Sequence, residues 1–310
     1  MRLRNWVGDV TLGLPTLQRL ADAGYSLQLL GKGWAGDLLA GQGWPVHTLA
    51  GSLRGRVLQL RELRAQARLQ DSGFDARLNA LCFPYSFSSA LEFRLAGLRA
   101  LGHAYEGRSP LLKRAVQRPQ GMHELQVYWH LGSSLLGADA PLPTSIGLRT
   151  APQHHAQAAQ LRAEHGIAPG YIVVCPFAGG TWSGQDKTWP TFAEFVAQAL
   201  PAFGRSVVIV PGPGEEALAR EQFPSAQLLA GVGLGTYAAL LAEAALMVSN
   251  DTGPGHMAAA VGTPLLSVLG PSDPALWRAW GSNVQLLQGA ADGWPTVNDV
   301  AAATRSSLNV

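Results

Sequence analysis

The chain has 310 residues, which allows two domains, and its 47% hydrophobic and 14% charged residues exclude intrinsic disorder. It contains only two cysteines, Cys82 and Cys175, which excludes a disulfide scaffold and a zinc site made of four cysteines. Their apolar neighbours predict buried free thiols in a reducing compartment. No apolar run reaches the roughly 18 residues that span a bilayer, and Asp9 interrupts the start before a signal-peptide core develops, so we expect a cytoplasmic protein.

The net charge of +2 conceals an asymmetry between the two halves. Residues 1–150 carry 17 Lys and Arg against 10 Asp and Glu, whereas residues 151–310 carry 6 against 11. Five arginines gather in one short stretch of the first half: Arg54, Arg56, Arg61, Arg64 and Arg68. A solvated helix face and attraction to an anionic partner both explain such a cluster, and both stay open here. The positive excess is too small to predict a nucleic-acid-binding protein.

Helical patterns alternate with short apolar runs along the whole chain. The first half predicts helices at residues 12–20 and 90–101 and strands at residues 26–30 and 76–83. The second half predicts strands at residues 171–175, 206–210, 246–249 and 264–269 and helices at residues 156–165, 192–200, 237–245 and 256–261. This alternation is typical of parallel sheets with crossover helices. We therefore expect two Rossmann-like α/β domains, residues 1–155 and 156–310, joined within a stretch of proline and polar residues.

Ligands of such folds bind at the carboxyl ends of the strands, so the loops there are the candidate sites. Three loops carry polar residues next to glycines: Gly8-Asp9, the segment 179–187 and the segment 249–256. Glycines let the backbone approach a ligand, and a helix N-terminus attracts phosphate. Plain helix caps and a lone surface lysine explain the same residues equally well.

Two other patterns are weaker. Residues 31–36 spell G-x-G-x-x-G after a predicted strand, which is the pattern of a dinucleotide-binding oxidoreductase. However, no acidic residue for the ribose follows at about 20 positions, and helix packing explains these glycines as well. Six histidines show no metal-ligand spacing: His103, His123, His130, His154, His155 and His165. No Asp-x-Asp motif is present either. The sequence therefore predicts no metal site and no cofactor.

Several motifs together resemble the heptosyltransferase family of glycosyltransferases, family 9. The first half contributes Asn5-Trp6-Val7-Gly8-Asp9, Leu14-Pro15-Thr16-Leu17, Pro84-Tyr85-Ser86-Phe87-Ser88-Ser89-Ala90-Leu91 and Gly107-Arg108. The second half contributes Lys187-Thr188-Trp189-Pro190, Asn250-Asp251-Thr252-Gly253-Pro254-Gly255-His256 and Gly270-Pro271-Ser272-Asp273-Pro274. The resemblance covers most of the chain and leans toward the lipopolysaccharide heptosyltransferase II branch.

The resemblance implies a GT-B fold, in which two Rossmann-like domains face each other across a cleft. It implies an inverting, metal-independent enzyme that moves a heptose from an ADP-heptose-like donor to the inner core of lipopolysaccharide. The implied partners are this donor and an anionic, lipid-linked saccharide acceptor, with peripheral membrane contact through the Arg-rich first domain. The implied location is the cytoplasm, at the inner face of the inner membrane.

The family also implies a role for individual residues. Asp9 would take the proton from the acceptor hydroxyl. Eight residues would bind the nucleotide sugar: Thr181, Ser183, Lys187, Glu215, Asp251, Thr252, Gly253 and His256. Among them, Lys187 would stabilise the diphosphate leaving group and Glu215, or the adjacent Glu216, would contact the ribose. The loop 231–235 would border the base.

Simple chemistry agrees with these roles, because an inverting transfer needs one base and a stabilised leaving group. One departure from the family is the first strand, for which only residues 1–4 precede the Gly-Asp turn. This strand is either very short or begins outside the given sequence. Two alternatives to a transferase therefore remain: a nucleotide-sugar-binding relative without activity and, from residues 31–36, an oxidoreductase.

Overall fold

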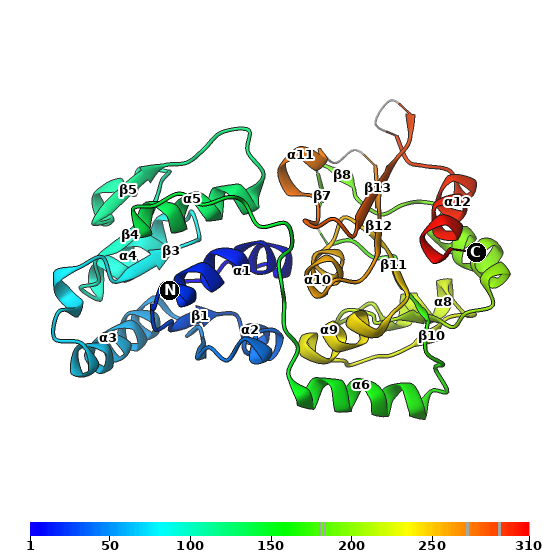
Figure 1. The fold of residues 1–310 in the computed structure, drawn as a ribbon, viewed down its shortest axis with the longest axis horizontal. Coiled ribbons are helices and arrows are strands. Elements are labelled where there is room, and N and C mark those ends of the chain that lie inside the picture. The colour runs from blue at the N-terminus through cyan, green and yellow to red at the C-terminus, as the bar shows by residue number, and fades with distance from the viewer. Residues whose placement is uncertain (180, 183, 271–272, 291–292, 310) are drawn as a thin grey trace. The chain divides into compact units, whose positions relative to one another are not determined.

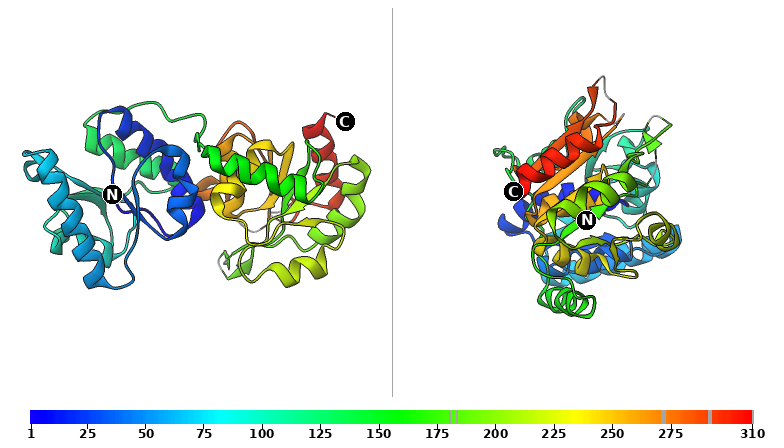
Figure 2. Two further views of the ribbon diagram at one scale, coloured as in Figure 1. Left: turned by 90° about the horizontal axis from the view of Figure 1, so that it is seen from below. Right: turned by 90° about the vertical axis from the view of Figure 1, so that its right-hand side faces the viewer.

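The computed structural model divides the chain into two compact α/β units (Figure 1). Unit 1 comprises Met1–Leu39 and Gly43–Pro143, and unit 2 comprises Ala40–Gln42 and Thr144–Val310. The structure describes every residue except 180, 183, 271–272, 291–292 and 310. Two parallel-sheet domains are thus confirmed. Their boundary lies before the predicted residue 155, because helix α6 (Pro152–Glu164) packs along α9 (Leu234–Glu243) of unit 2 (Figure 2).

Unit 1 consists of short parallel strands connected by helices. Its helices are α1 (Val7–Asp22), α2 (Trp34–Leu38), α3 (Leu53–Gln70), α4 (Phe87–Leu95) and α5 (Glu124–Leu136). Its strands are β1 (Leu29–Gly31), β2 (Val46–Thr48), β3 (Ala80–Cys82), β4 (Ala100–Ala104) and β5 (Arg114–Gln117). The helix predicted at residues 90–101 is wrong in its second half, because Gly97 adopts a left-handed φ of 74° that ends the helix and lets β4 begin.

The first strand of unit 1 is reduced to one residue. Arg2 pairs in parallel with both Leu30 of β1 and Cys82 of β3. Its backbone N–H donates to the carbonyl of Leu81 at 3.1 Å, and the N–H of Leu3 donates to the carbonyl of Leu30 at 2.8 Å. With Arg2 in place, the strands follow the order β2-β1-Arg2-β3-β4-β5, which is the Rossmann order. Arg2 therefore occupies the position of the first strand in this order.

Helices cover both faces of this sheet. Helices α3 and α4 cover the face to which Leu30, Ala80 and Cys82 contribute core side chains. Helices α1 and α5 pack against each other so closely that a Cβ on Gly132 would lie 2.8 Å from a methyl carbon of Thr16. By strand alternation, these two helices cover the opposite face.

The arginine cluster of residues 54–68 lies on α3 and mostly ties the helix to its own unit. Arg56 pairs with the buried Glu92 of α4 at 2.6 Å, and Arg64 and Arg68 pair with Asp75 at 2.9 and 3.2 Å. Arg61 donates to the carbonyl at the end of α4. These bonds hold α4 and the segment after α3 in place, so most of the cluster has an internal role.

Unit 2 contains a six-stranded parallel sheet in the order β10-β9-β6-β11-β12-β13. Its strands are β6 (Ile172–Cys175), β9 (Val207–Ile209), β10 (Gln227–Leu228), β11 (Leu246–Asn250), β12 (Leu265–Leu269) and β13 (Val284–Gln288). A separate antiparallel hairpin is formed by β7 (Thr181–Trp182) and β8 (Gln185–Asp186). The remaining helices of unit 2 are α7 (Phe192–Glu194), α8 (Glu216–Gln222), α10 (Gly253–Val261), α11 (Pro274–Trp277) and α12 (Val297–Leu308). Helix α7 continues through a π-turn at Phe195–Ala199.

The order of this sheet reverses between β6 and β11. From β6 the chain moves outward to β9 and β10, and it then returns to the other side of β6 to form β11. Such a switch point is where open α/β sheets bind ligands. The helices α7, α8 and α12 cover one face with an aromatic core, and α9 and α10 cover the other.

Three findings bear on the composition. Cys82 and Cys175 are both free and buried, as predicted. Within the described residues, no helix combines the length and apolar character needed to cross a membrane. The same residues hold no group of three or more His, Cys, Asp and Glu side chains with metal-binding geometry.

Candidate active site

Asp9 lies in the first turn of α1, directly after the Arg2 strand. Its carboxylate is only 8% exposed. The oxygen Oδ1 accepts a hydrogen bond from the hydroxyl of Tyr128 on α5 at 2.8 Å and from Nε of Arg4 at 3.3 Å. The free backbone N–H groups of a helix N-terminus favour a negative charge at this position. Two donors, one from α5 and one from the segment before α1, therefore hold the Asp9 carboxylate.

A cluster of charged and aromatic side chains surrounds Asp9. The hydroxyl of Tyr85 donates to the buried carboxylate of Glu124, which Arg118 also binds at 2.8 Å. The guanidinium of Arg4 lies over the ring of Tyr85, with its central carbon 4.5 Å from the ring centre. Two arginines and two carboxylates thus balance each other within unit 1.

The two tyrosines of this cluster stay protonated. Burial raises the pKa of Tyr128 well above its ordinary value, and the negative charge of Asp9 raises it further. Burial likewise raises the pKa of Tyr85, with the charge of Glu124 as the second cause. Each hydroxyl therefore remains a hydrogen-bond donor to its carboxylate throughout the physiological pH range.

In unit 2, the structure brings three predicted residues together at the switch point. Lys187, which follows β8, lies with Nζ 3.2 Å from Oδ2 of Asp251, which follows β11. Nε2 of His256 on α10 lies 4.0 Å from Oδ1 of the same carboxylate. Asp251 therefore holds an ammonium group on one side and an imidazole on the other, at the start of a helix.

The start of α10 is shaped by Thr252 and by glycine. The side chain of Thr252 accepts a hydrogen bond from the N–H of Gly255, so Thr252 is the N-cap of the helix. Gly253 is the first helical residue. A Cβ on Gly255 would lie 2.7 Å from Oγ of Ser249, so a side chain here would have to displace the Ser249 hydroxyl. The cap interpretation of Thr252 is confirmed, and the cap presents the helix N-terminus beside Asp251.

Glu215 lies next to the same strand ends. Its carboxylate accepts a hydrogen bond from the N–H of Gly212 at 2.8 Å, and that of Glu216 accepts one from Gly214 at 2.9 Å. Burial raises the pKa of the Cys175 thiol to about 12, and the negative charge of Glu215 adds to the rise. Glu215 itself is the residue before α8, in the loop that follows β9, and β9 is the neighbour of β6 in the sheet.

The other predicted contacts are less fully defined. Thr181 belongs to β7 and pairs with Asp186 of β8, and its side chain is not described. Ser183 lies outside the described residues. The loop 231–235 leads into α9, where Gly235 lies directly against the imidazole of His154 on α6. These assignments stay predictions.

Asn250 is a structural residue of the site whose role the sequence analysis did not identify. It is fully buried, and its side-chain oxygen accepts the backbone N–H of Trp189 at 3.0 Å. Its amide nitrogen donates to the carbonyl of Pro176 at 2.6 Å. One side chain thus joins the loop after β6, the segment next to Lys187 and the end of β11. The sequence marked Asn250 as part of a motif, but these contacts depend on the sheet order.

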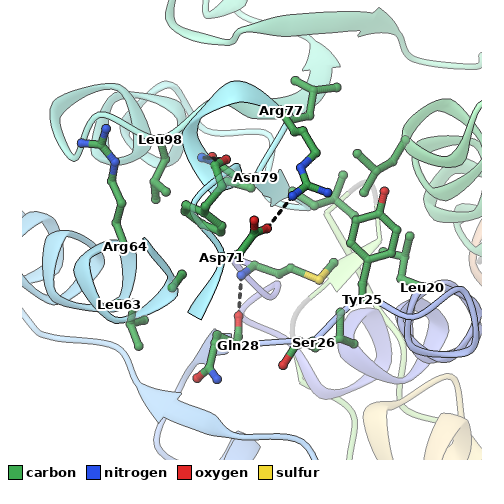
Figure 3. Close-up of a pocket in the computed structure, with 18 of the residues that line it drawn as sticks. Leu20, Tyr25, Ser26, Gln28, Leu63, Arg64, Asp71, Arg77, Asn79 and Leu98 are labelled. Carbon is green, nitrogen blue, oxygen red and sulfur yellow. Dashed lines mark hydrogen bonds and ion pairs between the residues drawn. The ribbon is translucent and has the colours of Figure 1, made fainter. Parts of the chain in front are cut away.

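Two further features of unit 1 are unrelated to this chemistry. A Cβ on Gly31 would lie 2.8 Å from the Cβ of Ala35, so helix packing explains the start of the 31–36 glycine pattern. A cavity of about 600 Å³ lies at the amino ends of β1 and β3, where Gln28 and Asn79 line it (Figure 3). None of the predicted site residues lines this cavity, and Asp9 lies at the opposite edge of the sheet.

Comparison with known proteins agrees with these motifs. The profile of glycosyltransferase family 9 (heptosyltransferase) matches residues 63–301. The chain is 36% identical over 142 residues to lipopolysaccharide heptosyltransferase 3 of Escherichia coli, covering 42% of this chain and 40% of the relative. It is 32% identical over 186 residues to lipopolysaccharide heptosyltransferase 1 of Pseudomonas aeruginosa, covering 56% and 48%. Each match therefore spans less than half of the curated relative.

Solved structures extend the likeness over the whole chain. E. coli ADP-heptose lps heptosyltransferase II matches with a TM-score of 0.79 at 22% identity, covering 99% of this chain and 97% of the other. A glycosyl transferase family 9 protein from Veillonella parvula matches with a TM-score of 0.83 at 16% identity, covering 100% and 96%. Such identities show the fold, and the lean toward branch II stays a prediction. The chain belongs to glycosyltransferase family 9, the heptosyltransferase family, and has its GT-B fold.

Proposed function

We propose that this protein transfers a heptose, with inversion and without a metal ion, from an ADP-heptose donor to the inner core of lipopolysaccharide. The observation that carries the proposal is the grouping of Lys187, Asp251 and the N-terminus of α10 at the switch point of unit 2, in a chain of family 9. Solved structures of E. coli WaaC contain ADP and ADP-2-deoxy-2-fluoro heptose, which supports an ADP-sugar donor.

The donor side of the proposal concerns the leaving group. As the glycosidic bond to the sugar breaks, negative charge develops on the diphosphate. The ammonium of Lys187 and the free N–H groups at the start of α10 would stabilise this charge without a metal ion. Asp251 would keep the ammonium of Lys187 aligned, and His256 would support Asp251. Thr181 and Ser183 would add hydroxyl contacts, and Glu215 would bind the ribose.

The acceptor side rests on Asp9 as the single base. Its carboxylate would take the proton of the acceptor hydroxyl as that oxygen attacks the anomeric carbon from the face opposite the diphosphate. A general base of this kind accelerates a reaction by roughly 10²–10⁴-fold.

The loops next to Asp9 fit an amphiphilic acceptor. Four large apolar side chains are exposed where the chain leaves the strand ends of unit 1: Trp6, Phe87, Tyr105 and Met122. The three aromatic side chains among them are of the kind that favours a membrane–water interface. The four exposed side chains support a lipid-linked acceptor and peripheral contact at the inner face of the inner membrane. The arginines of α3 give weaker support, because most of them pair with groups inside unit 1.

Sugar transfer from a panel of ADP-, UDP- and GDP-sugars, with and without EDTA, tests the proposal. We expect turnover and thermal stabilisation with the ADP-heptose alone, unaffected by EDTA. Asp9→Asn should lower the rate by roughly 10²–10⁴-fold. Asp22→Asn, the same change at the other end of α1, serves as the matched control. Stabilisation by the donor without any turnover would instead identify a nucleotide-sugar-binding relative, and saturable NAD(H) binding would revive the oxidoreductase.

A further inference from the structure

The two oxygens of the Asp9 carboxylate have different surroundings. Oδ1 accepts both hydrogen bonds, one from the Tyr128 hydroxyl at 2.8 Å and one from Nε of Arg4 at 3.3 Å. Oδ2 accepts no hydrogen bond from any residue that the structure describes. One oxygen is therefore occupied by fixed donors, and the other keeps its lone pairs for an incoming proton.

We infer that Tyr128 and Arg4 are positioning residues that orient Asp9 so that Oδ2 is the oxygen that takes the acceptor proton. This inference rests on the proposed function of Asp9 as the base. Tyr128 and Arg4 do not exchange the proton themselves. They determine which oxygen is available and in which direction its lone pairs point.

Tyr128 is well held for this task. Its side chain is fully buried, and its ring packs on Phe83 with the two ring centres 4.9 Å apart. It comes from α5, which packs tightly on α1, the helix that carries Asp9. Because both helices and the ring are fixed, the hydroxyl reaches Asp9 in one orientation. A donor held in this way limits the side-chain rotation of Asp9 without blocking Oδ2.

Arg4 is held by a separate set of contacts. Its guanidinium lies over the ring of Tyr85, and the Tyr85 hydroxyl is bound to Glu124. Burial alone would lower the pKa of Arg4, but the negative charges of Asp9 and Glu124 act in the opposite direction and favour the charged guanidinium. Arg4 therefore stays charged, and the two donors of Oδ1 come from different segments, α5 and the residues before α1. Reorientation of Asp9 would require both to move.

Tyr128→Phe isolates the hydroxyl, because the phenylalanine keeps the ring contact with Phe83. We expect kcat to fall by roughly 10- to 100-fold, while the KM for the donor and the melting temperature change no more than in the control. The control is Tyr171→Phe, which removes another buried hydroxyl, one that donates to the carbonyl of Leu240 in unit 2. For Arg4, the lysine variant should retain more of kcat than the methionine variant, since lysine preserves the charge.

The same change in the Asp9→Asn background completes the test. If Tyr128 acts through Asp9, Tyr128→Phe will have no further effect on the residual rate of Asp9→Asn. The positioning role would be overturned if Tyr128→Phe lowered the rate by the same factor in the wild-type and the Asp9→Asn protein. It would also be overturned if Tyr128→Phe had the wild-type rate while Asp9→Asn was inactive. Both results would leave the proposed base intact. A near-wild-type rate for Asp9→Asn would overturn the base, and the positioning inference with it.

Discussion

Lys187 and Asp251 form an ion pair of 3.2 Å across 64 positions of the sequence, with only 17% and 12% of their side chains exposed. Each partner is largely shielded from water, so the pair is stronger than an exposed one. The pair keeps a positive charge in place at the switch point of the sheet before any diphosphate arrives. A bound donor would then find this cation already aligned.

The first prediction concerns this cation. Lys187→Met should lower kcat by roughly 10²–10³-fold, because one preorganised group that stabilises the leaving-group charge is lost. Lys32→Met, on unit 1, provides the matched control for the loss of a lysine. Steady-state transfer with the ADP-heptose donor measures both. A rate for Lys187→Met that equals the control would remove Lys187 from the proposed mechanism.

The second prediction concerns Asn250. Asn250→Ala should lower the free energy of unfolding by about 1–3 kcal/mol, because it leaves the N–H of Trp189 and the carbonyl of Pro176 buried without partners. Urea denaturation checks the change, with the exposed Asn298→Ala on α12 as the control. Transfer activity should fall as well, since the segment that carries Lys187 loses its attachment. Unchanged stability would show that water replaces the side chain.

The third prediction concerns Gly255. Gly255→Ala should destabilise the protein by about 1–3 kcal/mol, because its Cβ would lie 2.7 Å from Oγ of Ser249. Ser249→Ala in the same chain should recover most of this loss by removing the clashing oxygen. Gly36→Ala on α2 is the control: nothing lies within 4 Å of its added Cβ, so it should be neutral or slightly stabilising. Thermal melts of the three variants, compared with the unchanged protein, decide the matter.

The fourth prediction concerns the amino group of Met1. Burial lowers its pKa from 8.0 to about 5, and it donates to the carbonyl of Gln28 at 2.5 Å. Between pH 5 and 8 the unfolded chain therefore binds a proton that the folded chain does not. Between pH 5 and 8 the free energy of unfolding should therefore rise with pH, by at most about 4 kcal/mol. Above pH 8 this contribution should level off.

An N-acetylated chain checks this pH dependence. Acetylation removes the titrating amine, and the neighbouring cavity leaves room for the acetyl group. Urea midpoints measured from pH 5 to 8 should rise more steeply for the free amine than for the acetylated chain. Parallel curves would mean that the amino group keeps its ordinary pKa in the folded protein.

Several strands of unit 2 were predictable because their signal is local. Residues 171–175 and 207–210 form unbroken apolar runs, since both faces of a parallel sheet are covered by helices. The strand β5 was missed, because three of its four residues are exposed and it shows no such run. The helix predicted at residues 90–101 was too long, because the helical spacing of apolar residues continues past Gly97. The left-handed φ of Gly97, which ends the helix, cannot be predicted from that spacing.

The amino-acid sequence by itself determined the α/β class, the family motifs and the short segments from which Asp9, Lys187 and Asp251 come, because apolar runs, glycine turns and neighbouring polar residues are local properties of the chain. Only the tertiary structure decided which distant side chains meet. Tyr128 reaches Asp9 across 119 positions, Trp189 reaches Asn250 across 61, and the arginines of α3 find carboxylates on other elements. Such contacts depend on strand order and helix packing, and no local pattern encodes them.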